Sequence, residues 1–173
     1  MKKIKIKGIN EELFYTKLKS GLEVYLIPDS KSKSFYMSYV VKYGSVYNEF
    51  RVGINKKYHI LPNGVAHFLE HLMFKEKDGS EASLRFSKYG SRINAYTDID
   101  NTCYYLSGAK SFKENLSDLL DFVNNPYFTE ENVSKEKGII IEEIKMGNDN
   151  PYKEFNVKAL ENNITELNSL SNT

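Results

Sequence analysis

Short segments in which apolar and polar residues alternate predict four strands along this chain. They are rich in Val, Ile, Tyr and Phe, residues that favour extended backbone, and turn-forming residues interrupt them. They cover residues 23–28, 35–43, 92–97 and 102–107. The last two flank the polar link 98–101 and are therefore expected to form a hairpin. Residues 47–61 are polar and without a clear period, which predicts an irregular connector.

Two helices are predicted between the second and third strands. Residues 65–74 are apolar apart from three polar side chains, a composition typical of a buried helix, and Asn63 is the expected N-cap. Residues 80–89 form the next helical segment, which Gly90 is expected to close.

Two longer helices are predicted after the hairpin. Ser111 and Glu114 have the spacing of a capping box, and Asn125-Pro126 ends the helix that they open. Its expected apolar stripe consists of Phe112, Leu116, Leu119, Leu120 and Val123. Thr129 is the expected cap of the following helix, and Pro151 is expected to begin a last one. Strands grouped with helices in this order predict an α+β fold, a mainly antiparallel sheet with helices packed on one face.

Composition narrows the class of protein. The chain has 173 residues, of which 40% are hydrophobic and 13% aromatic, enough for the core of one domain. A net charge of +1 argues against a dedicated nucleic-acid surface, and no segment approaches the ~18 apolar residues of a membrane span. The N-terminal lysines precede no apolar stretch, so a signal peptide is not expected. One cysteine suits a reducing compartment, and we expect a cytoplasmic protein.

The candidate catalytic and metal-binding side chains cluster in the motif His67-Phe68-Leu69-Glu70-His71, which has the pattern H-x-x-E-H. Because successive helical residues rotate by about 100°, His67, Glu70 and His71 project from one face. Two imidazoles on one face can bind a metal ion, and the carboxylate beside them can accept a proton. The alternative is a pair of core histidines that are hydrogen-bonded to their neighbours.

A catalytic zinc site needs a third protein ligand, and several residues are candidates. Cys103 and His59 qualify by residue type. Glu136 and Glu143 lie on one helical face among buried aliphatic positions, where carboxylates are rare unless they are paired. Glu143 could bind the metal, and Glu136, two turns earlier, could orient a ligand.

Residues 64–75 resemble the active-site helix of the pitrilysin/insulinase family of zinc peptidases, nearly residue for residue. Glu143 and Glu136 match the family's third metal ligand and the functional glutamate seven residues before it. Residues 93–97, followed by 102–105, are similar to its active-site edge strand. The resemblance implies one zinc ion per chain held by His67, His71 and Glu143, with Glu70 as general base. It also places Asn94 and Ala95 beside the backbone of the substrate.

The resemblance implies a metalloendopeptidase that cleaves extended oligopeptides or small unfolded proteins, and it implies a second homologous half as partner. It runs to about Glu161, so we expect an incomplete catalytic domain over residues 1–161. Residues 162–173 are rich in Asn, Ser and Thr and are predicted to be a divergent, disordered tail. Two alternatives stay open at this point: a non-catalytic partner subunit, or a truncated remnant that binds metal and is inactive. Self-association is a further expectation for an incomplete domain.

Overall fold

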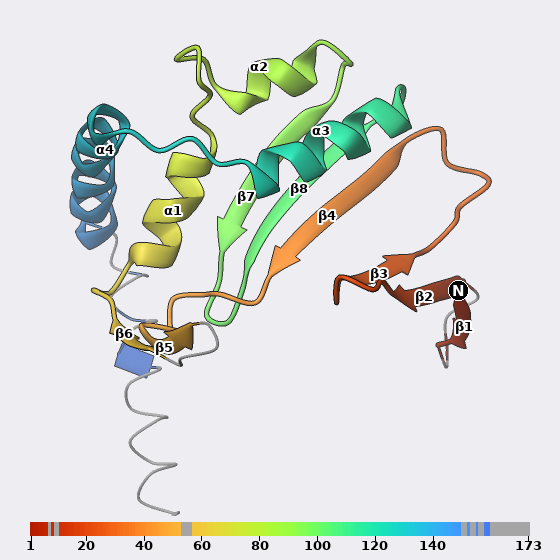
Figure 1. Cartoon of the computed structure of the whole chain (residues 1–173), viewed down its shortest axis with the longest axis horizontal. Coiled ribbons are helices and arrows are strands. Elements are labelled where there is room, and N and C mark those ends of the chain that lie inside the picture. The colour runs from red at the N-terminus through yellow and green to blue at the C-terminus, as the bar shows by residue number, and fades with distance from the viewer. Residues whose placement is uncertain are drawn as a thin grey trace, which may run out of the picture. The chain divides into compact units, whose positions relative to one another are not determined.

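The computed structural model describes residues 1–6, 8, 11–52, 57–149, 152, 155, 158 and 159. The expected tail at 162–173, the boundary at 161 and Pro151 itself lie outside the described residues. The described residues just after Pro151, which are 152, 155, 158 and 159, are helical. The chain divides into two compact units, Met1–Phe35 and Tyr36–Thr173. Along the chain, strands β1–β6 are followed by helices α1 and α2, the strands β7 and β8, and the helices α3 and α4, as labelled in Figure 1.

The first unit is an antiparallel three-stranded sheet. Its strands pair in the order β1-β2-β3 and are β1 (Lys2–Lys5), β2 (Glu12–Lys17) and β3 (Glu23–Leu26). A tight turn at Gly21, which has φ +93°, connects β2 to β3. The sequence predicted only β3, because lysines at alternate positions hide the pattern of β1.

The second unit is built on a sheet with the strand order β4-β8-β7. The strands are β4 (Phe35–Val41), β7 (Arg92–Thr97) and β8 (Thr102–Gly108). The expected hairpin is present, with Asn94 opposite Tyr105 and Ala95 opposite Tyr104. In Figure 1, β4 and β7 point the same way, so the central strand β8 runs antiparallel to both. This sheet confirms the mainly antiparallel arrangement.

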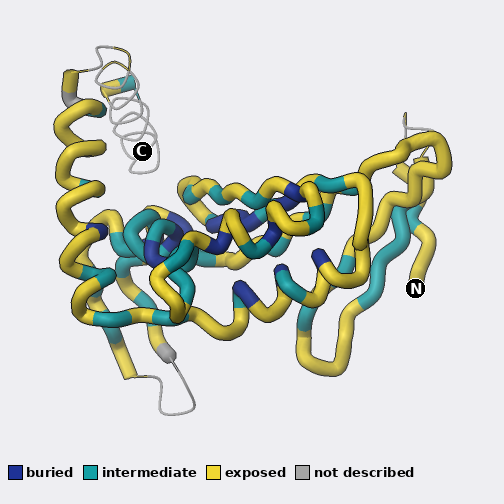
Figure 2. The backbone as a smooth tube through the Cα atoms, turned by 90° about the horizontal axis from the view of Figure 1, so that it is seen from above, coloured by how far each residue is buried: buried dark blue, intermediate teal, exposed yellow. Residues whose placement is uncertain are grey.

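The helices of the second unit whose bounds fall within the described residues are α1 (Val65–Met73), α2 (Ala82–Ser87), α3 (Phe112–Asn124) and α4 (Glu130–Asn148). The described part of the chain holds its buried residues in this unit, as Figure 2 shows in dark blue. Phe86, Leu106 and Leu119 are at most 2% exposed, and Phe122 contacts the rings of both Phe86 and Tyr104. In this core, α2 and α3 pack with one face of β8. This packing confirms the predicted α+β fold.

Three local predictions are wrong. Residues 47–61 contain a two-stranded sheet, β5 (Glu49–Val52) and β6 (Lys57–Ile60), where we expected an irregular connector. Helix α1 is capped by Gly64 at φ +87°, and the Asn63 side chain instead accepts a hydrogen bond from Asn48 at 2.7 Å. Ser111 has φ +55°, outside the extended backbone region typical of a side-chain cap, and its side chain makes no capping bond.

The predicted stripe of α3 also differs from its buried face. Asn115, Leu119 and Phe122 are buried, whereas Phe112, Leu116 and Leu120 are exposed. Asn115 is tolerated in the core because its amide donates to the carbonyls of Lys110 and Ser111. Apolar spacing alone cannot select between two overlapping faces.

The remaining helix predictions agree with the structure or differ only in length. Helix α2 is shorter than residues 80–89, and Gly90 follows it with φ +71°. Thr129 caps α4, since its hydroxyl accepts a hydrogen bond from the Asn132 amide at 3.1 Å. Among the described residues, no helix combines the length and the apolar character that crossing a bilayer requires.

Candidate metal centre

Helix α1 presents the motif residues where two other elements meet. It packs against α4 and against the sheet strands β7 and β8. Ala66 and Leu72 are buried in these contacts, and Glu70 is buried with them at 8% exposure. His67 and His71, one turn apart, remain partly exposed on the side that faces α4. The sequence therefore forms a helix whose apolar residues fix the direction of its polar face.

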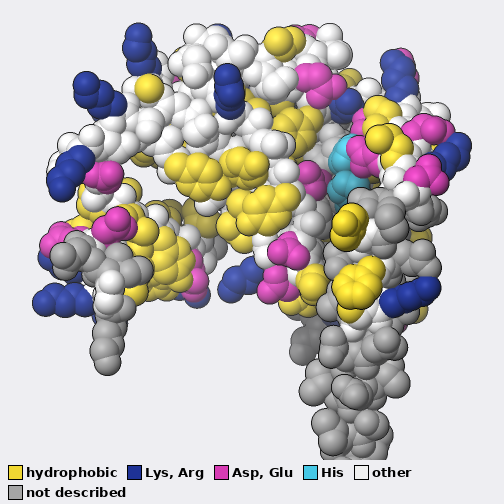
Figure 3. Space-filling view, turned by 180° about the vertical axis from the view of Figure 1, so that it is seen from behind, with side chains coloured by type: hydrophobic (Ala, Val, Ile, Leu, Met, Phe, Trp, Pro, Cys, Tyr) yellow, Lys and Arg dark blue, Asp and Glu magenta, His cyan; other side chains and the backbone are white. Residues whose placement is uncertain are grey.

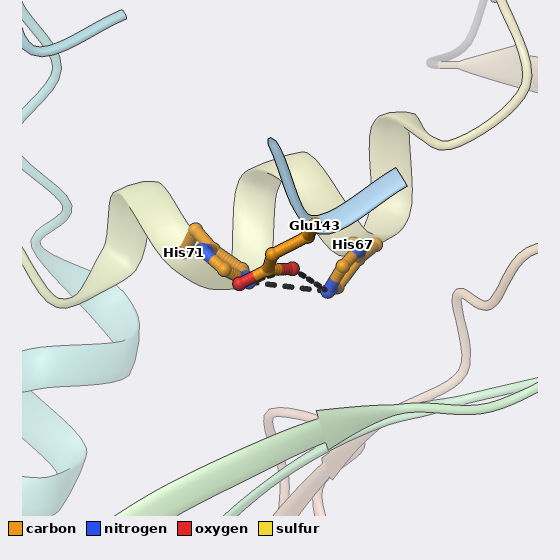
Figure 4. A group of neighbouring side chains, drawn as sticks. All are labelled: His67, His71 and Glu143. Carbon is orange, nitrogen blue, oxygen red and sulfur yellow. Dashed lines mark hydrogen bonds and ion pairs between the residues drawn. The ribbon is translucent and has the colours of Figure 1, made fainter. Parts of the chain in front are cut away.

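Three side chains converge between α1 and α4. The Nε2 atoms of His67 and His71 lie 3.1 Å apart, and Glu143 Oε2 lies 3.8 Å from the first and 3.7 Å from the second. One ligand atom from each residue lies within 4.8 Å of the others. Figure 4 shows the carboxylate of Glu143 entering from α4 toward both rings. Of the candidates for third ligand, Glu143 is thus the residue that the fold brings to the histidines.

The geometry of this group fits a zinc ion. Ligands at 2.0–2.1 Å from a tetrahedral zinc lie about 3.4 Å from one another. The three separations here, 3.1, 3.7 and 3.8 Å, bracket that value. Two imidazole nitrogens and one carboxylate oxygen are the donor types of catalytic zinc sites. The side chains of His67 and Glu143 are each 45% exposed, so solvent reaches this group of side chains.

Glu136 orients His71 from the buried side. Its Oε1 lies 2.8 Å from His71 Nδ1, and its side chain is only 3% exposed. A carboxylate only accepts hydrogen bonds, so this contact favours a proton on Nδ1, and in the neutral ring Nε2 then keeps its lone pair. That lone pair points toward His67 and Glu143, as metal binding requires.

Glu70 is held by a hydroxyl that sequence reasoning missed. Thr97 Oγ1, at the end of β7, donates to Glu70 Oε2 at 2.6 Å. Thr102 Oγ1 lies 3.4 Å from Thr97 Oγ1, but it donates its own hydrogen to the carbonyl of Tyr43. The alternation along β7, which turns Thr97 toward the helices, is the signal that could have identified it.

Burial raises the pKa of the Tyr104 phenol well above its ordinary value, and the charge of Glu70 raises it further. Tyr104 therefore remains a neutral phenol near Glu70 over the physiological range. It adds a polar group to the site without adding a charge.

Asn94 and Ala95 lie on β7, which ends the β4-β8-β7 sheet in the described part of the chain. Asp98 and Asn101 form a hydrogen-bonded pair at the start of the hairpin, so strict alternation directs the backbone groups of Ala95 toward the free edge. The Ala95 amide donates to the Asn94 side chain at 2.9 Å. Both residues therefore stand at an edge that can accept another strand.

The two other candidates for third ligand lie elsewhere. His59 stacks on Phe50 across the β5-β6 pair, with ring centroids 5.8 Å apart. Cys103 is buried in β8 opposite Tyr96. Neither belongs to the group formed by His67, His71 and Glu143.

Comparison with known proteins agrees with this geometry. The model of the insulinase family, peptidase family M16, matches residues 24–173. An uncharacterized zinc protease of Bacillus subtilis, YmfH, is 41% identical over 163 residues, which are 94% of this chain and 38% of that protein. The beta subunit of human mitochondrial-processing peptidase is 34% identical over 90 residues, 48% of this chain and 18% of its own length.

A solved structure shares the fold at similar identity. It is a putative M16-like peptidase from Alicyclobacillus acidocaldarius, with a TM-score of 0.78 and 40% identity. The match covers 84% of this chain and 34% of that one. This chain thus spans little more than a third of the length of such relatives.

Proposed function

The chain belongs to the insulinase family, peptidase family M16, and we propose that His67, His71 and Glu143 hold one zinc ion that serves the hydrolysis of peptide bonds. The family match and the zinc-protease relatives support the metallopeptidase class that the sequence predicted. The observation that carries the proposal for this chain is the convergence of the three side chains between α1 and α4. The site opens to solvent, since imidazole side chains reach the surface beside acidic ones (Figure 3).

The residues around the site divide the chemistry among them. Zinc, when bound, supplies a Lewis acid that activates water and polarises the scissile carbonyl. Glu70 accepts the proton of the attacking water and delivers it to the leaving amine. Thr97 holds the Glu70 carboxylate at 2.6 Å, which limits its rotation during both transfers. Glu136 keeps the proton of His71 on Nδ1 and so acts through that ligand.

The substrate that suits this site is an extended peptide. The free edge of β7 can pair with an added strand through the backbone of Ala95, beside Asn94. Pairing through backbone groups requires an unfolded segment and recognises many sequences. We therefore propose oligopeptides or small unfolded proteins as the substrate class, without a preference for one cleavage sequence.

A homologous partner is part of the proposal. The chain spans 38% of YmfH, and the name of the human relative describes a subunit. We propose that a second, homologous half faces the zinc site in the working enzyme, and that the enzyme is cytoplasmic. Self-association of this chain is the simplest form of such pairing.

The deciding experiment measures zinc and turnover together. Metal analysis of the purified chain is expected to give one zinc per chain. Cleavage of short unstructured peptides, assayed with the chain alone and with a supplied second half, is expected to disappear with a chelator and return with zinc. Absence of zinc binding would refute the metal centre. Zinc binding with no cleavage under either condition would instead favour a non-catalytic partner or an inactive remnant.

A further inference from the structure

A lysine just beyond the motif helix reaches the buried carboxylate behind the metal centre. Lys75 follows α1 by two residues, and its Nζ lies 3.2 Å from Glu136 Oε2 and 2.7 Å from Glu81 Oε1. Its backbone is fixed on both sides, because its amide donates to Leu72 O at 3.1 Å and a β-bridge pairs it with Glu81. The lysine is thus held at the point where α1 ends and α4 passes.

Glu136 needs this contact more than an exposed carboxylate would. Its side chain is 3% exposed, and a buried charge is costly unless it is paired. Oε1 is occupied by His71 Nδ1, and Oε2 has no hydrogen bond within the described residues. His71 must be neutral to bind a metal, so it cannot supply the countercharge. The Lys75 ammonium is the cation that lies beside the second oxygen.

Glu81 is the other ion-pair partner of Lys75, and it depends less on this ammonium than Glu136 does. It is 49% exposed, so water solvates its charge without help from Lys75. Its hydrogen bond, with a smaller contribution from Glu136, holds the pKa of Lys75 above the ordinary value, so the lysine stays charged. The electrostatic benefit of that charge is larger at the buried partner, where solvent screening is weaker.

We propose that Lys75 is a positioning residue of the metal centre: by binding Glu136 Oε2 it holds the carboxylate so that Oε1 fixes the Nδ1–H form of His71, whose Nε2 then faces the zinc. The inference rests on the proposed zinc site. It extends the contact between His71 and Glu136 to Lys75, which lies in the segment that follows the motif. Without Lys75 the carboxylate is free to rotate, and the ring orientation of His71 is no longer fixed.

Zinc affinity of Lys75→Met provides the first test. Loss of an outer partner of a metal ligand costs about 10–100-fold in affinity, and we expect a loss in this range. Lys75→Arg keeps the charge and is expected to restore most of the affinity. The matched control is Glu81→Gln, which removes the exposed partner and should change affinity by less than about fivefold. An unchanged affinity in Lys75→Met, or an equal loss in Glu81→Gln, would overturn the proposal.

A double-mutant cycle with Glu136→Gln shows whether Lys75 acts through that carboxylate. If it does, Lys75→Met weakens zinc binding in the native background and adds little to Glu136→Gln. Additive losses would show an independent, merely structural effect and would contradict the inference. Thermal unfolding of each variant establishes that the compared proteins are folded. If Lys75→Met is not folded, Lys75→Arg keeps the test decisive.

The ring nitrogens of His71 give a readout that needs no metal. In the metal-free chain, nitrogen-15 shifts should show a proton fixed on Nδ1 in the native protein and in Lys75→Arg, and a mixture of forms in Lys75→Met. The same fixed form in Lys75→Met would sink the proposal even if zinc affinity fell. The native chain could bind no zinc and still show a proton on His71 Nδ1 that depends on Lys75. In that case the zinc site would be refuted and the role of Lys75 would stand.

Discussion

At the scale of single residues, the proposed site separates the groups assigned to metal binding from the group assigned to proton transfer. His67, His71 and Glu143 share one point, whereas Glu70 is not a member of that group and is hydrogen-bonded to Thr97. Glu70 and Glu143 carry the same functional group, and their different neighbours suit them to different roles. Substitutions that keep shape while removing charge can distinguish these roles.

Glu70→Gln should abolish turnover and leave the metal in place. Glutamine keeps the size of the side chain and an acceptor for Thr97, but it cannot take a proton from water. We expect kcat to fall by about 10² or more, with zinc content unchanged by metal analysis. His71→Ala is the contrasting variant, because it should lose the metal itself. If Glu70→Gln strips the zinc, Glu70 is a ligand and the assignment of roles is wrong.

Glu143→Gln should weaken zinc binding strongly, since an amide oxygen is a poorer and uncharged ligand. Glu142→Gln is a matched control one residue away, because Glu142 is exposed and pairs with Lys145 at 2.7 Å. Competition with a chelator of known affinity measures both variants. Equal affinities for the two would remove Glu143 from the proposed ligand set.

At the scale of elements, the sequence predicted what repeats regularly and missed what depends on backbone conformation. The β7-β8 hairpin and the Thr129 cap follow from local patterns, and the structure contains both. The left-handed backbone of Ser111 is a conformation that a capping-box pattern does not reveal. Thr97 and Lys75 were missed because their contacts join elements that the sequence does not place side by side.

The cap of α4 should contribute measurably to stability. Thr129→Ala removes the acceptor for the Asn132 amide and is expected to lower the free energy of unfolding by about 1 kcal/mol. Ser111→Ala is the comparison, because Ser111 makes no capping bond and its loss should cost less than about 0.5 kcal/mol. Denaturant unfolding of both variants measures the difference. Equal losses would mean that the structure misassigns one of the two caps.

The buried face of α3 can be tested with two adjacent leucines. Leu119 is 2% exposed and Leu120 is 37% exposed, although the sequence placed both on one stripe. Leu119→Ala should lower the free energy of unfolding by about 2–5 kcal/mol through lost burial and a residual cavity. Leu120→Ala should cost clearly less. Reversed magnitudes would show that the predicted stripe, and not the observed one, faces the core.

At the scale of the whole molecule, the described part of the chain has a formed ligand group but leaves large apolar side chains uncovered. Ile141, Ile144 and Met146 on α4 are 52%, 52% and 72% exposed and lie close in sequence to Glu143, the proposed third ligand. Exposed apolar side chains of this kind are typical of surfaces that pack against something else. Because the chain spans 38% of YmfH, the homologous remainder is the proposed occupant.

We therefore expect the chain alone to bind zinc but to cleave peptides weakly or not at all. A site open to water gives little help in ordering an extended peptide, so the substrate is poorly positioned at the metal. Adding a homologous second half should raise turnover on short unstructured peptides while zinc content stays constant. The added turnover should vanish with a chelator and with Glu70→Gln, which ties it to this site. Full chelator-sensitive turnover by the isolated monomer, equal to that of an intact relative, would show that no facing half is needed.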